Sequence, residues 1–497
     1  MRKRTDSPGL GVLGSGALTA ASTVFVTGFA GVVGIVIARE FGRTPQTDGF
    51  FAAYSVFIVI VLAAQAIRVA VLPALARARK DHRLASDTAG YAIAIAVVAL
   101  PLVLLAEFGA DQLADLLTGN GSESSQQAAS EALRWMVPAA VAHLFAGLAA
   151  SALAALDDYV TAALGYAAGS AAGLGLILVR VEPDGIEAVA WGMALNGLIA
   201  LVVPTIGLAW RARRTKMPAG AVHPAGAPLS TRLGTFAAAA SLPIALQLLY
   251  VVCVPFAGRL GTGAVTSFGY AYLGAAALVA ITASSLGLVS SVPLTRIGID
   301  EDRTAVHIVS ACWLALAFVG VAAGVFAVAG SDLVEAVLGG SYGGDVGSEL
   351  GILVVAFSPW MVATVGTSVT FPLTFVAERT RLLPWIGIGA LALQIPLAWV
   401  AWRTFELVGL ALALAATTFL VLALLLRELG ALRPVTWGLG SATVTLGVIT
   451  ALAFLAPALV FDDVAGALVG FVVYVVLLAV VKPRGLHLAW QYMRSLG

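Results

Sequence analysis

One polar stripe inside an apolar stretch has the residue types to bind a ligand. Residues 47–83 run from a short polar lead through GFFAAYSVFIVIVLAAQAIRVAVLPAL to the basic end ARARKDHR. Gln65 and Arg68 are three residues apart, and Tyr54 lies on the same face of the helix that would carry them. A guanidinium inside a bilayer should face protein or water, or extend to the nearby basic end of the span. The first case predicts that this face lines an internal polar site.

Groups of the same kind occur in three other apolar stretches. Thr27 ends a series of hydroxyl residues spaced four apart. Gln247 and Tyr250 share a helical face, and Tyr272 and Ser285 lie in the stretch that follows. Hydroxyl, amide and aromatic groups suit sugar recognition; for each residue alone, a hydrogen bond between neighbouring helices is the alternative. The predicted substrate-binding residues are Thr27, Tyr54, Gln65, Arg68, Gln247, Tyr250, Tyr272 and Ser285.

Membrane spans must position these groups. Hydrophobic residues make up 60% of the 497 residues and charged residues only 11%, against about 25% charged residues in a soluble domain. The expected fold class is an all-α integral membrane protein of about fourteen transmembrane helices, with two parallel six-helix pseudo-repeats and two C-terminal helices. The spans are expected near 12–38, 50–76, 88–106, 132–156, 159–179, 187–210, 233–257, 263–294, 305–329, 350–376, 382–401, 405–426, 435–458 and 463–481.

The basic residues fall into two unequal sets when alternate connectors are compared. Most lie on one side, beginning with the MRKR start and the runs within 77–83 and 211–216. The other side carries acidic connectors and only five arginines, Arg39, Arg43, Arg180, Arg259 and Arg403. By the positive-inside rule the basic side is cytoplasmic. We therefore expect a multi-pass protein of the cell membrane with both termini in the cytoplasm.

An internal repeat appears at a shift of 220 positions. GFFAAYSVFIVIVLAAQAIRVAVLPAL then falls without a gap on GYAYLGAAALVAITASSLGLVSSVPLT, so that Gly49 meets Gly269 and Pro73 meets Pro293. Amphipathic runs, FGADQLADLLTG and SDLVEAVLGG, follow the third and ninth spans and are predicted as helices on the outer surface. Parallel halves of this kind usually enclose the substrate path. The predicted domains are an N-terminal six-helix lobe (1–216), a cytoplasmic linker (217–230), a C-terminal six-helix lobe (231–430) and two extra spans with a cytoplasmic tail (431–497).

The sequence carries no motif for catalysis, a cofactor or a metal. A phosphate-binding Gly-Lys-Ser or Gly-Lys-Thr loop is absent, and Cys253 and Cys312 lie in apolar runs without a nearby His or carboxylate at ligand spacing. The net charge is +1, and the charges are sorted by membrane side rather than gathered in a patch. We therefore expect neither an enzyme nor a nucleic-acid-binding protein.

Three short runs resemble the MviN/MurJ lipid II flippases. REFGRTPQTDGFFAAYS at 39–55 is similar to that family's first outer loop and second helix, and FGYAYLGA and SSVPLTR are similar to its matching stretch in the second half. The resemblance places the chain in the superfamily of multidrug, oligosaccharidyl-lipid and polysaccharide (MOP) exporters. It implies a flippase that moves a polyprenyl-diphosphate-linked cell-envelope glycan precursor, such as lipid II, to the outer leaflet by alternating access. The partners it implies are that glycan lipid, membrane lipids and, as candidates, cell-wall synthesis proteins.

The chain departs from the resemblance at the positions of the family's cavity charges. Thr27 and Val33 stand where cavity arginines are expected, Gly34 stands at the neighbouring acidic position, and Tyr272 and Leu273 replace an Asp-Arg pair. Diphosphate binding favours several guanidiniums, because paired charge-assisted bonds match phosphate geometry. Three alternatives therefore stay open: a flippase for another polysaccharide or teichoic-acid lipid intermediate, a cation-coupled small-molecule exporter, and a non-transporting membrane scaffold.

Overall fold

The chain is a multi-pass, all-α membrane protein, as expected. The computed structural model describes residues 28–119, 121–214, 227–280, 301–377 and 379–496. Within these ranges every regular element is a helix, and eleven helices are long and apolar enough to cross a membrane.

A helical stretch at 28–41 comes first. It is followed by α2 (Pro45–Lys80), α3 (Leu84–Phe108), α4 (Ala110–Thr118), α5 (Glu123–Ala155), α6 (Tyr159–Asp184), α7 (Glu187–Arg214), α8 (Leu229–Gly258), α9 (Ala264–Val279), α11 (Glu301–Leu338), η2 (Gly340–Tyr342), α12 (Asp345–Ala356), α13 (Ser358–Val376), α14 (Leu383–Glu428), α15 (Leu432–Ala458), α16 (Asp463–Val481) and α17 (Arg484–Leu496).

Helix α14 contains two of the predicted spans. The spans expected at 382–401 and 405–426 are joined by a connection so short that only Phe405 and Glu406 leave the helical conformation, Glu406 with a φ of 52°. The predicted spans at 12–38 and 263–294 lie partly outside the described residues. Their described parts are the helix at 28–41 and α9.

The chain forms two compact units. Unit 1 comprises the described residues within Met1–Phe41, Ala52–Leu116 and Ser122–Gln247, and unit 2 those within Gly42–Phe51, Leu117–Gly121 and Leu248–Gly497. The predicted lobe boundaries stay a prediction, and most of the linker expected at 217–230 lies outside the described residues.

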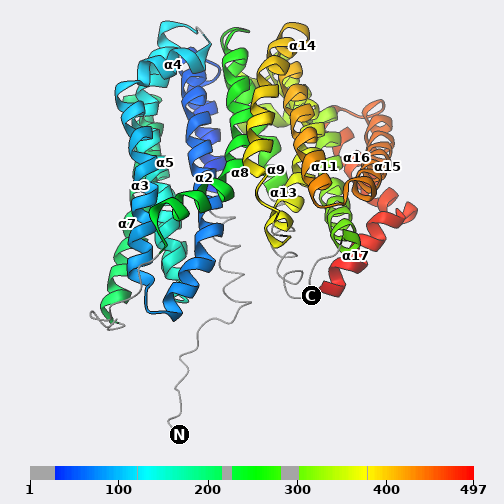
Figure 1. Cartoon of the computed structure of the whole chain (residues 1–497). Helices are drawn as coiled ribbons and strands as arrows, with labels where there is room; N and C mark the ends of the chain where they lie inside the picture. The colour runs from blue at the N-terminus through cyan, green and yellow to red at the C-terminus, as the bar shows by residue number, and fades with distance from the viewer. Residues whose placement is uncertain (1–27, 120, 215–226, 281–300, 378, 497) are drawn as a thin grey trace. The chain divides into compact units, whose positions relative to one another are not determined.

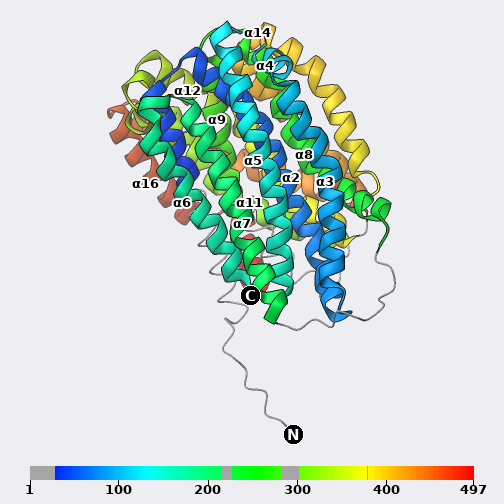
Figure 2. The same ribbon diagram turned by 90° about the vertical axis from the view of Figure 1, so that its left-hand side faces the viewer.

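In unit 1, α7 lies between α5 and α6, and Figure 2 shows the three helices side by side. Small residues make this approach close, because glycine lets helix backbones come together. A Cβ on Gly173 of α6 would lie 2.5 Å from the Gly192 carbonyl oxygen, and one on Gly169 would lie 2.7 Å from that of Asn196. Larger side chains at these positions would force α6 away from α7.

In unit 2, α15 and α16 pack on α11, as Figure 1 shows. Tyr474 of α16 is buried, and its hydroxyl donates to the carbonyl oxygen of Ala317 at 2.9 Å. Ile449, Ala453 and Phe454 of α15 complete the buried cluster around that ring. The two C-terminal spans are therefore an integral part of unit 2.

The repeat shift of 220 reappears in the backbone. Helix α3 ends at Phe108, and Gly109 separates it from α4. Helix α11 leaves the helical conformation at Ala329, and 109 + 220 = 329. Helix α4 ends at Thr118 and α11 at Leu338, again 220 positions apart. Each end is followed by a glycine with positive φ, at 119 and 339, a conformation that commonly terminates helices. The two predicted amphipathic runs are thus helices at equivalent places.

Candidate functional site

Arg68 lines a small cavity inside unit 1, together with His143 of α5 and Tyr166 of α6. The His143 side chain is buried, and its ring plane lies within 3° of that of Tyr166, with the ring centroids 6.2 Å apart. The rest of the wall is apolar or glycine, from Val61, Ala64 and Gly147.

The charge of this cavity is positive. None of its lining residues is acidic, and no carboxylate of the described ranges forms an ion pair with Arg68. Leaving a guanidinium without a counter-ion inside a membrane span is costly. An oxyanion would offset this cost through charge-assisted hydrogen bonds, for which the planar guanidinium is well suited. The Arg68 cavity measures about 10 Å³ in this structure, room for about one water molecule, so a phosphate or carboxylate could enter only if the cavity widened.

Helix α2 places Tyr54 on the same side as this cavity. Tyr54, Val61 and Arg68 follow each other at intervals of seven, about two helical turns, and the last two line the cavity. The Tyr54 ring stacks on Phe57, with centroids 5.7 Å apart and planes 19° apart. Charges complement the helix dipole at both ends, with Asp48 in the first turn and three basic residues in the last.

Tyr250 and Tyr272 lie together in unit 2. Their rings stack with centroids 3.9 Å apart and planes 10° apart, and both residues are 2% exposed. Phe268 and Trp360 flank the pair, with Phe268 stacked on Tyr250 and Trp360 tilted against Tyr272. The rings are thus occupied by aromatic packing in this structure, and their contact with a substrate stays a prediction.

The remaining predicted residues are only partly described. Gln247 is buried on α8, with 9% of its surface exposed. Thr27, Ser285 and the side chain of Gln65 lie outside the described residues. The structure thus brings Arg68 together with His143 and Tyr166, two residues that no sequence pattern links to it.

Asp48 organises a second polar cluster, in unit 2. Its carboxylate accepts hydrogen bonds from the backbone N–H groups of Gly263 (2.6 Å) and Thr266 (2.9 Å) and from the Thr266 hydroxyl (2.6 Å). Gly263 directly precedes α9, has a φ of 86° and offers no side chain to cap the helix. Asp48 therefore caps the start of α9 from a distant part of the chain. The negative charge also complements the positive end of the helix dipole.

Arg43 and Tyr342 extend this cluster. The Arg43 guanidinium donates to the Gly263 carbonyl oxygen at 3.3 Å and pairs with Glu349 at 3.3 Å. The Tyr342 hydroxyl donates to the Gly42 carbonyl oxygen at 3.0 Å, and burial raises the pKa of Tyr342. Arg43 and Gly263 are repeat mates, since 43 + 220 = 263. Contact between equivalent positions is what a local two-fold relation between the two stretches produces.

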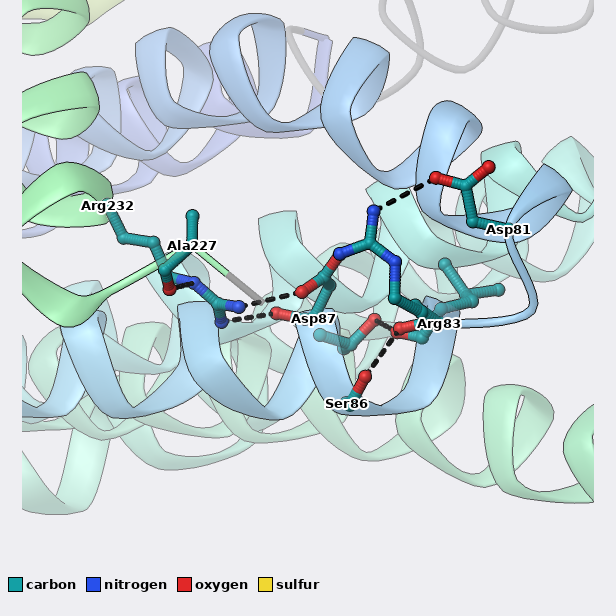
Figure 3. A network of polar contacts seen from close by, with 8 residues as sticks. Asp81, Arg83, Ser86, Asp87, Ala227 and Arg232 are labelled. Atoms are coloured by element: carbon teal, nitrogen blue, oxygen red, sulfur yellow. Dashed lines mark hydrogen bonds and ion pairs between the residues drawn. The ribbon is translucent and has the colours of Figure 1, made fainter. Parts of the chain in front are cut away.

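A third polar cluster lies at the start of α3 in unit 1, where Asp87 is held between two arginines (Figure 3). Arg232 of α8 donates to the Asp87 carboxylate at 2.7 Å, and Arg83 lies 3.7 Å from its other oxygen. Arg232 also donates to the carbonyl oxygens of Asp87 and Ala227, both at 3.0 Å, and lies over the Tyr91 ring. This Arg232 clamp, formed by side chains only 6% and 13% exposed, fixes the beginning of α8 on α3.

Solved structures resemble the chain over most of its length. A lipid II flippase MurJ in an inward closed conformation aligns with a TM-score of 0.72 and 16% identity, covering 94% of this chain and 98% of that one. The chain has the fold of the MOP superfamily transporters. An inward-facing multidrug resistance MATE transporter aligns at 0.60 with 15% identity (84% and 96% covered), and a MOP superfamily transporter from Pyrococcus furiosus at 0.54 with 14% identity (86% and 96%).

No protein-family model and no curated protein matches the sequence. The similarity to solved structures nevertheless confirms the MOP fold that the sequence resemblance implies. These structural neighbours are transporters, whereas the contribution of each predicted residue stays a prediction.

Proposed function

We propose that this protein is a membrane flippase that moves a polyprenyl-diphosphate-linked, lipid II-like glycan precursor from the inner to the outer leaflet by alternating access. The observation that carries the proposal is the similarity to a lipid II flippase structure over 94% of this chain. The six-helix lobes predicted at 1–216 and 231–430 would be the two moving halves.

The Arg68 cavity supports an anionic cargo. A diphosphate carries the oxyanion groups that the Arg68 guanidinium can bind in pairs, and Tyr166 adds a hydroxyl to the same cavity wall. Tyr54 lies on the same side of α2, where a phenol can contact a sugar. The other predicted residues, Gln247 among them, would contribute further hydroxyl and amide contacts to the glycan.

A cation-coupled exporter is the second candidate, because a MATE transporter shares the fold. Such a mechanism needs a carboxylate that can take up a cation inside the membrane. Asp48 is a buried carboxylate in a span, but it already accepts three hydrogen bonds from Gly263 and Thr266. This engagement, together with the positive charge at Arg68, favours the flippase.

Orientation and location form part of the proposal. We place the basic connectors in the cytoplasm, so that both termini are cytoplasmic and the protein lies in the cell membrane. The Asp48 cluster would then lie at the outer ends of α2 and α9. Lipid II synthesis and polymerisation proteins are the candidate protein partners.

The test is the accessibility of lipid II from outside the cell. Cells depleted of the protein are treated with an external enzyme that cleaves only outward-facing lipid II headgroups. We expect cleavable lipid II to disappear on depletion and to return with the wild-type gene but not with Arg68→Ala. Arg259→Ala, which removes an arginine from a connector, is the matched control and should restore cleavage. Unchanged cleavage after depletion would rule out lipid II as the cargo.

A further inference from the structure

The junction between α16 and α17 forms a pocket that the proposed transport does not use. The pocket measures about 290 Å³ and lies within unit 2. Leu314 of α11 and Leu478 of α16 form its apolar floor, and the junction and α17 supply the rest, Lys482, Pro483, Leu486, His487 and Trp490. An apolar floor with a cation, Lys482, at its edge matches an amphiphilic ligand.

Packing against α11 holds this pocket in shape. A Cβ on Gly485 would lie 2.2 Å from the Trp313 ring, so α17 approaches α11 as closely as a glycine allows. Ala489 is 1% exposed, and the Tyr492 hydroxyl lies 3.4 Å from His307 Nδ1. These three α17 residues follow each other at intervals of four and three, which places them on one face. Figure 1 shows α17 running from the end of α16 past α11.

The neighbouring face of α17 carries positive charge. His487, Trp490 and Arg494 lie along one stripe, and Arg494 is 5.2 Å from the centroid of the Trp490 ring. Lys482, Arg484 and Arg494 are exposed and form no ion pair with a carboxylate of the described ranges. None of the pocket residues is acidic. The edge of the pocket therefore carries positive charge, which a negatively charged ligand would neutralise.

We propose that this pocket binds the headgroup of an anionic phospholipid, with the first part of an acyl chain on Leu314 and Leu478. Basic pockets between membrane helices attract acidic lipid headgroups, and Trp490 lies on α17, the helix that follows the last span, where a tryptophan can reach the membrane interface. The volume is near the lower end of the range for small-ligand sites, about 300–1,000 Å³. It therefore suits a headgroup and a short chain segment rather than a whole lipid. The proposal does not depend on the transported cargo.

Fluorescence quenching tests the lipid preference directly. The full chain is reconstituted into phosphatidylcholine vesicles that contain a minor fraction of brominated phosphatidylglycerol or, in parallel, brominated phosphatidylcholine. The emission of Trp490 is obtained as the difference between the wild type and Trp490→Phe. We expect the anionic lipid to quench Trp490 at lower mole fractions than the neutral lipid. Equal quenching by the two lipids would overturn the proposal.

Charge variants identify the source of the preference. Lys482→Asn with Arg494→Gln should weaken the preference for the anionic lipid about fivefold for each cation removed. Asparagine is chosen because Lys482 has a φ of 44°, a conformation that asparagine tolerates. Arg433→Gln removes an exposed cation that does not line the pocket and should leave the preference unchanged. A double variant that keeps the wild-type preference, or an equal loss in Arg433→Gln, would overturn the proposal.

Discussion

Replacing Gly90 by alanine should destabilise the wild-type protein but stabilise the Arg232→Ala variant. An added Cβ at Gly90 would lie 1.2 Å from Arg232 Nη1 and 2.1 Å from its Cζ, so the guanidinium would have to leave the clamp. It would then lose its 2.7 Å hydrogen bond to the Asp87 carboxylate. A hydrogen bond to a charged group contributes about 1.5–3 kcal/mol, whereas alanine gains about 1 kcal/mol over glycine inside a helix. The net loss from that bond alone is about 0.5–2 kcal/mol.

The effect of Gly90→Ala on the free energy of unfolding should change sign when Arg232 is replaced by alanine. In the Arg232→Ala background the new methyl group meets no guanidinium, and only the helix-propensity gain of about 1 kcal/mol remains. Unfolding free energies of the wild type, both single variants and the double variant, measured in mixed micelles by detergent titration and circular dichroism, give the interaction energy. Gly175→Ala is the matched control, because nothing lies within 4 Å of its Cβ position. Equal effects of Gly90→Ala in both backgrounds would refute this reasoning.

Three further predictions concern the other features. Asp48→Ala should cost more unfolding free energy than Asp48→Asn, by about 1–3 kcal/mol, because only asparagine keeps an acceptor for the Thr266 donors; equal costs in a detergent titration would contradict the capping role. Gly173→Val should lower the unfolding midpoint more than Gly175→Val, since only the first site faces a neighbouring backbone; the reverse order would exclude close α6–α7 packing as the cause. In the lipid II cleavage assay, Arg68→Lys should restore less cleavable lipid II than the wild type but more than Arg68→Ala, because lysine keeps the positive charge without the planar guanidinium. Full restoration by both variants would show that Arg68 does not bind the cargo.

Local sequence patterns predicted most of the helices. Span positions depend on hydropathy within one segment, and the amphipathic helix α4 depends on periodicity over about three turns. Helix boundaries were less predictable where the flanking residues are polar. Helix α5 begins at Glu123, well before the span expected at 132–156, because Ser122 caps it by accepting from the backbone N–H of Ser125. Hydropathy does not register such a capped polar turn.

The clusters could not be predicted, because they depend on which helices pack together. His143 and Tyr166 are 75 and 98 positions from Arg68, and no local pattern links them. Asp48 and Thr266 are 218 positions apart. The repeat shift offered a clue, since it pairs position 43 with 263, but it does not specify that repeat mates touch. Position 90 needs glycine because the Arg232 guanidinium occupies the space that a Cβ would take, and the sequence alone does not show that contact.

The matching breaks at Gly109 and Ala329 also bear on the history of the chain. Two gene copies that diverge freely accumulate insertions and deletions, and connectors tolerate them best. Here the interval from the break to the end of the following helix has the same length in both halves, although most of its side chains differ. If the two halves derive from duplicated segments, divergence has replaced residues without a net change in chain length at this place. Selection on the lengths of these short helices would explain why substitution was tolerated there and insertion was not.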